Sequence, residues 1–109
     1  MNAALHAYGR ARAAANPRSL EADIFLRVNG ALRGAPDAVL RARALADNRR
    51  LWCAVEQALR DPANALPLPL RAQILSLGRV VLRELDAPEP DGDFLINVNE
   101  NVAAGLAGG

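Results

Sequence analysis

The residues that could carry chemistry are few and lie far apart in this 109-residue chain. His6 is the only histidine and Cys53 the only cysteine, so no disulfide can form within the chain and no metal-ligand cluster is evident. Asp91 and Asp93 have the spacing of two calcium ligands, but Leu95 stands where a third ligand is needed, and a helix N-cap explains the pair better. No glycine-rich phosphate loop is present. The sequence therefore predicts no catalytic residue, metal, cofactor or small-molecule ligand, and it favours a binding protein.

One polar side chain lies where an apolar one is expected. In a helix predicted from about Pro36 to Arg60, Asn48 shares the apolar stripe with Trp52 and Val55, whereas Arg50 faces water. A buried amide costs roughly 1–3 kcal/mol unless its hydrogen bonds are met, so Asn48 should have a partner on a neighbouring helix. A structural role, in which Asn48 sets the register of the helices, is favoured over direct contact with a ligand.

Five helical segments are predicted from the apolar spacing and from the breaks between them. Asn16-Pro17, the run Gly34-Ala35-Pro36, and two proline-containing stretches at 61–69 and 87–92 interrupt the helical pattern. Residues 1–109 are therefore expected to form a single all-α domain, a compact bundle of four to five helices. The expected helices cover residues 2–15, 17–33, 36–60, 69–84 and 93–106.

The apolar rows of these helices predict a mainly aliphatic core. The helix over residues 69–84 carries the widest apolar face and should be the most buried one, and Gly78 in its interior indicates a close crossing with another helix. Eight residues are assigned to the structural core: Ile24, Val28, Asn48, Trp52, Val55, Ile74, Leu77 and Val81.

Charge is distributed unevenly along the chain. Residues 1–83 contain all thirteen arginines and six acids, a net charge of +7, whereas residues 84–109 contain six acids and no base, a net charge of −6. The acidic end is expected to fold back onto the basic body, which is favoured over a role in repelling polyanions. No segment has the roughly 15–20 uninterrupted apolar residues of a signal peptide or membrane span, so a cytoplasmic location is expected.

The two ends of the chain are the candidate partner-binding elements. The first helix, within residues 1–15, has a narrow apolar face and is the segment most prone to mobility or docking, although simple packing is favoured. The terminal helix, 93–106, combines an apolar row with asparagines and a glycine that lower helix propensity. It is either a partner-binding element or lid, released by the linker at 87–92, or a permanently docked part of the core. The partner-binding candidates are Tyr8, Leu95, Ile96, Val98, Asn99, Val102 and Leu106.

Several stretches in order along the chain resemble the alphaproteobacterial flagellar biosynthesis regulator family FlaF. They are Ala7-Tyr8, Asn16-Pro17-Arg18-Ser19-Leu20-Glu21-Ala22, Asn48-Arg49-Arg50-Leu51-Trp52, Asn64-Ala65-Leu66-Pro67, Leu70-Arg71-Ala72-Gln73-Ile74-Leu75-Ser76-Leu77, Leu95-Ile96-Asn97-Val98-Asn99 and Gly105-Leu106. The chain departs from the family pattern at Gly78-Arg79, Glu100 and Ala103.

The resemblance implies a non-enzymatic role in flagellin biosynthesis. The favoured hypothesis is an export chaperone that holds the amphipathic terminal helices of flagellin in a groove. The alternative is a post-transcriptional regulator that acts with FlbT on flagellin message. Direct nucleic-acid binding is not expected, because the acidic terminal segment has the wrong sign for RNA and no aromatic stacking platform is evident. If RNA is involved, a partner such as FlbT is expected to contact it. A structural bundle that dimerises through its last helix is a third possibility.

Overall fold

The computed structural model describes the backbone of residues 17–108 and the side chains of residues 22–108. Four helices make up this part of the chain: α2 (Pro17–Gly34), α3 (Ala38–Arg60), α4 (Leu68–Leu85) and α5 (Gly92–Gly108). The predicted all-α class is confirmed, and each helix begins and ends within two residues of its expected limits. The expected first helix, with His6, Tyr8 and Asn16, lies outside the described residues.

Local signals in the sequence account for the helix ends. Asp37 is the N-cap of α3, where its carboxylate accepts a hydrogen bond from the backbone N–H of Leu40 at 2.9 Å. Asp91 caps α5 in the same way, accepting from the N–H of Phe94 at 3.1 Å. The aspartate pair considered above therefore serves as a helix start. At the far end of α3, the Arg71 guanidinium donates to the carbonyl oxygen of Leu59 at 2.9 Å, which satisfies a terminal carbonyl.

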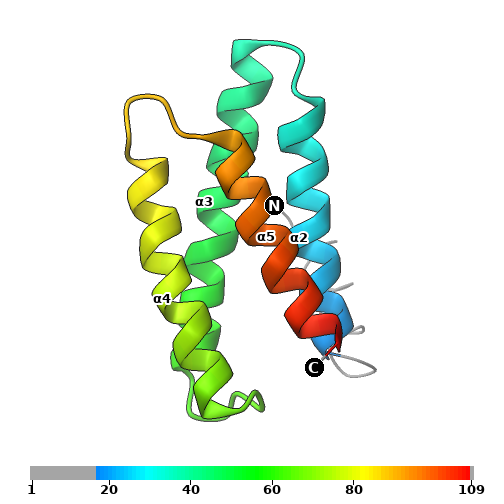
Figure 1. Ribbon diagram of the computed structural model, residues 1–109, viewed down its shortest axis with the longest axis vertical. Coiled ribbons are helices and arrows are strands. Elements are labelled where there is room, and N and C mark those ends of the chain that lie inside the picture. The colour runs from blue at the N-terminus through cyan, green and yellow to red at the C-terminus, as the bar shows by residue number, and fades with distance from the viewer. Residues whose placement is uncertain (1–16, 109) are drawn as a thin grey trace.

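The helices alternate in direction and follow one another around a ring (Figure 1). α2 lies beside α3, α3 beside α4, α4 beside α5, and α5 beside α2, with the α2–α5 contact the most extensive. Within the described part of the chain, the backbones of the two diagonal pairs, α3 with α5 and α2 with α4, do not approach each other. The core therefore lies between α3 and α5, and large side chains must bridge it.

α5, and not α4, is the most deeply buried helix, which corrects the expectation from the sequence. Six residues of α5 are buried and Leu95 is fully enclosed, whereas α4 contributes four buried residues. The reason is the extent of the contacts: α5 packs along α2 in the most extensive helix pair of the described chain, whereas both contacts of α4, with α3 and with α5, are less extensive. The width of an apolar face did not reveal which helix makes the most extensive contact with its neighbour.

The core is aliphatic around one aromatic pair. The rings of Phe25 and Trp52 meet edge to face, with centroids 5.4 Å apart and an interplanar angle of 70°. Four of the eight expected core residues are buried: Asn48, Trp52, Ile74 and Val81. Val55 and Leu77 are partly buried against the core, and Ile24 and Val28 are half-buried outside it. α2 instead turns a neighbouring face inward, because Phe25 packs on Trp52 and Asn29 hydrogen-bonds to α5. The buried residues of that face are Ala22, Phe25, Asn29 and Leu32.

The acidic end of the chain does fold back onto the basic body. Glu100 on α5 forms an ion pair with Arg33 on α2, and Asp86, just after α4, pairs with Arg49 on α3. All four side chains are substantially exposed, so each pair contributes only about 0–1 kcal/mol. The charge asymmetry is thus partly matched within the molecule, at two exposed ion pairs.

Candidate functional site

Three asparagines and one tryptophan form a buried hydrogen-bond network at the centre of the bundle. Asn29 on α2, Asn48 on α3 and Asn99 on α5 each have 0% of their surface exposed, and Trp52 has 1%. The indole Nε1–H of Trp52 donates to Asn99 Oδ1 at 2.9 Å. Asn99 Nδ2 then donates to Asn48 Oδ1 at 2.8 Å and to Asn29 Oδ1 at 2.9 Å. Asn99 is therefore the hub through which α5 is joined to α2 and α3.

The direction of each bond in this network follows from one donor. An indole N–H can only donate, so Asn99 must turn its oxygen toward Trp52 and its NH₂ toward the other two amides. Asn48 and Asn29 must then present oxygens. The remaining NH₂ of Asn29 meets an acceptor, the carbonyl oxygen of Ile96, at 3.0 Å. The network has one self-consistent orientation, and this ties α5 to α2 at two points.

The NH₂ of Asn48 is the exception. Among the described residues, Asn48 Nδ2 is the buried side-chain nitrogen or oxygen without a hydrogen-bond partner. The sequence correctly predicted that Asn48 would be buried and bonded to a neighbouring helix. It missed Asn29, although Asn29 stands four residues after Phe25 and three before Leu32, the spacing that marks one face of a helix.

The expected partner-binding residues of the terminal helix lie inside the domain. Ile96 is half-buried, Tyr8 is outside the described residues, and the others are buried against the core: Leu95, Val98, Asn99, Val102 and Leu106. The linker between α4 and α5 is also fastened. Arg41 on α3 donates to the carbonyl oxygen of Pro90 at 2.7 Å, and the backbone N–H of Asp91 donates to Glu84 Oε2 at 2.9 Å. In this structure α5 is a docked helix of the core.

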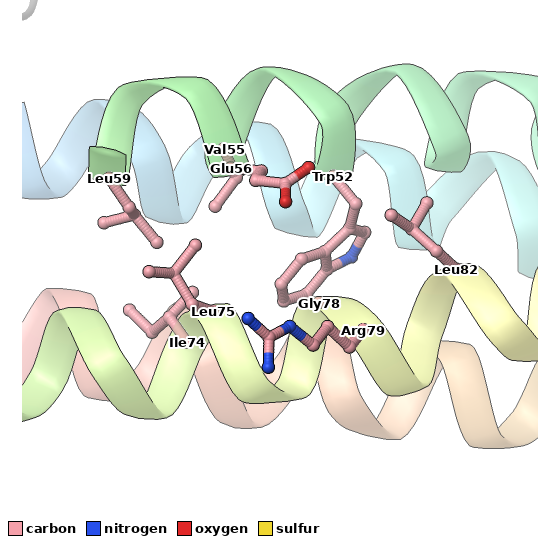
Figure 2. Close-up of a pocket in the computed structure, with 9 residues that line it drawn as sticks. All are labelled: Trp52, Val55, Glu56, Leu59, Ile74, Leu75, Gly78, Arg79 and Leu82. Carbon is pink, nitrogen blue, oxygen red and sulfur yellow. The ribbon is translucent and has the colours of Figure 1, made fainter. Parts of the chain in front are cut away.

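An apolar groove runs along the outer side of the α3–α4 contact (Figure 2). It faces away from α2 and α5, which lie behind α3 and α4 in this view. Aliphatic side chains from both helices form its walls, and its free volume of about 20 Å³ holds one water molecule or one methyl-sized group. The groove is too small for an organic ligand. Its aliphatic walls are Val55, Leu59, Ile74, Leu75 and Leu82.

At the base of this groove, the missing side chain of Gly78 lets α4 approach the indole of Trp52 closely. A Cβ added at Gly78 would lie 3.1 Å from Cε3 of Trp52, closer than side chains normally pack. The close helix crossing expected from Gly78 is confirmed. Trp52 thus uses both of its edges, the N–H toward the asparagine network and the carbon edge toward Gly78.

A second, open hollow of about 500 Å³ lies between the start of α3 and residues 88–92. Its cation, Arg41, already donates to Pro90 and would be 3.1 Å from a Cβ at Gly92, and the other charged residues there, Glu89 and Asp91, are acidic. At this hollow, the hydrogen bond from Arg41 to Pro90 therefore holds the linker at 87–92 against α3.

Other kinds of site receive no support from the described residues. No group of three or more histidine, cysteine, aspartate or glutamate side chains lies close enough there to hold a metal ion. Cys53 is a free thiol on the exposed side of α3. Over residues 17–108, no helix has the length and apolarity to cross a membrane.

Comparison with models of protein families identifies the family of this chain. A family model described as the flagellar protein FlaF matches residues 4–106, which include all four described helices almost completely. The chain belongs to the FlaF family. It is thus a flagellar protein, as its resemblance implied. No curated protein and no solved structure matches the chain.

The FlaF assignment gives the buried network a context. Two of the stretches that carry the resemblance, Asn48–Trp52 and Leu95–Asn99, are far apart in sequence, yet their ends meet in the hydrogen bonds of Asn99 to Asn48 and Trp52. These residues of the FlaF pattern therefore hold α3 and α5 across the core.

Proposed function

We propose that this chain is a non-enzymatic flagellar assembly factor of the cytoplasm that binds flagellin before export and promotes its synthesis and secretion. The observation that carries the proposal is the FlaF family match over residues 4–106. The favoured partner is an amphipathic helix of the flagellin subunit, bound as a helix laid in an apolar groove.

The physical properties of the domain support a protein partner. α3 and α4 leave an apolar groove between them on the outer face of the bundle, and five large apolar side chains of the described chain are at least 39% exposed. Covering the apolar side chains that line the groove is favourable through the hydrophobic effect, whereas the five exposed side chains do not line the groove. The exposed residues are Leu26, Val39, Leu40, Leu68 and Val80.

The test is direct binding between purified components. The full chain is mixed with purified, unpolymerised flagellin, and binding is measured by isothermal titration calorimetry and by co-elution in size-exclusion chromatography. A flagellin that lacks its terminal segments is the matched control. We expect a complex with full-length flagellin and none with the control. If full-length flagellin does not bind, the chaperone proposal is wrong.

The alternative is that the chain regulates flagellin message together with FlbT. The same purified protein can be used to distinguish this alternative from the chaperone proposal. A gel shift with the flagellin leader RNA at about 0.15 M salt should show no binding by the chain alone. We expect this because Trp52 and Phe25 are both buried and cannot stack on bases. If the chain binds the RNA with sub-micromolar affinity and does not bind flagellin, the regulator hypothesis is supported and the chaperone proposal is wrong.

A further inference from the structure

The α3–α4 groove has the shape of a socket for one apolar side chain of another helix. Its base is formed by Gly78 and the carbon edge of Trp52, and Leu75 and Leu82 lie to either side on α4 (Figure 2). In helix packing, a side chain of one helix inserts into a space between four residues of its neighbours. The Trp52 ring fills the space that a side chain at position 78 would take. The free space lies beside the ring and Gly78, and its volume of about 20 Å³ fits a methyl-sized tip.

The acidic residue beside the groove has an ion-pair partner, whereas the basic residues on α4 have none among the described residues. On the α3 side, Glu56 is paired with Arg60 at 3.0 Å, so its carboxylate is already neutralised. On the α4 side, Arg79 lines the groove and Arg83 follows one turn later, and both are exposed. Neither guanidinium has a side-chain hydrogen bond or ion pair with the described residues. Arg79 in the lining, and Arg83 one turn further along α4 and outside the lining, therefore carry two available positive charges.

An occupant of this groove must match both features. The socket requires an apolar side chain, and two arginines at i and i+4 are complementary to acidic side chains one turn apart on a helix lying alongside α4. That description fits an amphipathic helix whose apolar stripe is bordered by acidic residues. The apolar row of α5 is unsuitable for the same task, because Leu95 and Leu106 are 0% and 1% exposed.

We propose that the α3–α4 groove is the surface on which this chain binds an amphipathic, acid-bordered helix of flagellin. The inference rests on the proposed function, and it names the site and the chemistry of the bound segment. One apolar side chain of that helix occupies the socket over Gly78 and Trp52, while Arg79 and Arg83 pair with its acidic border. These two arginines are then determinants of affinity and of the salt dependence of binding.

The test is a charge reversal with a matched control. The variant Arg79→Glu, Arg83→Glu alters the groove rim, and Arg27→Glu, Arg43→Glu makes the same change in net charge at two other exposed arginines that do not line the groove. Binding of each purified full-length variant to unpolymerised flagellin is measured by calorimetry at low and at physiological salt. Thermal melts check that both variants keep the wild-type fold.

We expect the groove variant to bind flagellin at least about tenfold more weakly, which corresponds to about 1.4 kcal/mol, and to lose most of the salt dependence. The control variant should stay within about twofold of wild type. A second variant, Leu75→Gln, alters the apolar wall without changing the charge and should also weaken binding.

The outcomes distinguish the two proposals. If wild type binds flagellin and the groove variants bind as well as the control, the inference is overturned and the proposed function stands. If the groove and control variants lose affinity equally, general electrostatic attraction is responsible and the assignment of the groove is again wrong. If wild type does not bind flagellin at all, both proposals are overturned.

Discussion

The two edges of Trp52 make two different kinds of contact, one by hydrogen bonding and one by apolar packing. This difference explains how the bundle is organised. Its N–H edge donates to Asn99 and joins a network of buried amides that connects α2, α3 and α5. Its carbon edge lies against Gly78 of α4 in a contact made only by packing. A hydrogen-bond network requires one register and one orientation, whereas an apolar contact tolerates small shifts. The α5 side of the core is therefore specified by polar bonds, and the α4 side by shape.

Removal of α5 is the most severe way to break the polar side. Deleting residues 92–109 exposes the amides of Asn29 and Asn48 together with the apolar surface that Leu95 and Leu106 cover. We expect loss of the cooperative thermal transition and of most helical circular dichroism. A control that lacks only residues 107–109 should melt like wild type. A cooperative transition in the protein that lacks α5 would show that α5 is not required for the fold.

Truncation of Trp52 breaks both contacts at once. Trp52→Ala should lower the free energy of unfolding by about 3–5 kcal/mol, because the change leaves a cavity beside Phe25 and removes the donor to Asn99. Trp52→Phe keeps much of the packing and loses the N–H, so a smaller loss of about 1–3 kcal/mol is expected. Urea denaturation measures both values. An Ala variant as stable as wild type would contradict the burial of the indole.

Within the network, the hub and a peripheral amide should differ. Asn99→Leu leaves the Trp52 N–H and the oxygens of Asn29 and Asn48 without their partner and should cost about 3 kcal/mol. Asn48→Leu removes one accepted bond together with a donor that has no partner, so about 1 kcal/mol is expected. The two are compared in parallel urea titrations. Equal losses would mean that Asn99 is not the hub.

Glycine substitutions probe the shape-specified side. Gly78→Ala gains helix propensity, but its methyl meets a Trp52 ring held by Asn99 and Phe25, so a net loss of about 1 kcal/mol is expected. Gly105→Ala in α5 has nothing within 4 Å of the new methyl and should gain up to about 1 kcal/mol. Thermal midpoints report the signs. Stabilisation by both substitutions would show that α3 and α4 can shift apart at Gly78 and Trp52 at little cost in free energy.

The smallest effect is expected at the surface. Arg33→Ala removes the exposed ion pair with Glu100 and should cost less than about 1 kcal/mol, with the difference disappearing at high salt. Arg27→Ala, at an exposed arginine of the same helix without a described ion pair, is the control. A loss comparable to that of Asn99→Leu would mean that charge, and not the buried network, holds α5 against α2.

Much of this architecture could be read from the sequence because its causes are local. Helix limits follow from prolines and capping aspartates within a few residues, and the burial of Asn48 and Trp52 follows from their common face on α3. The close crossing at Gly78 was likewise marked by a single residue whose cost in a helix needed a compensating contact. The sequence also identified Asn99, although as a partner-binding residue and not as the hub.

Other features were decided only by the tertiary structure, because they depend on which faces of different helices meet. The sequence could not choose whether the inward face of α2 carries Ile24 and Val28 or Phe25 and Asn29, since both sets have helical spacing. Nor could it tell that α5, with poor helix propensity, would be the most buried helix. Its stability comes from α2 and from the buried amides, and a contact between residues 70 positions apart has no signature in local periodicity. The α3–α4 groove has the same origin, because its walls come from two helices and its base exists only where Gly78 meets Trp52.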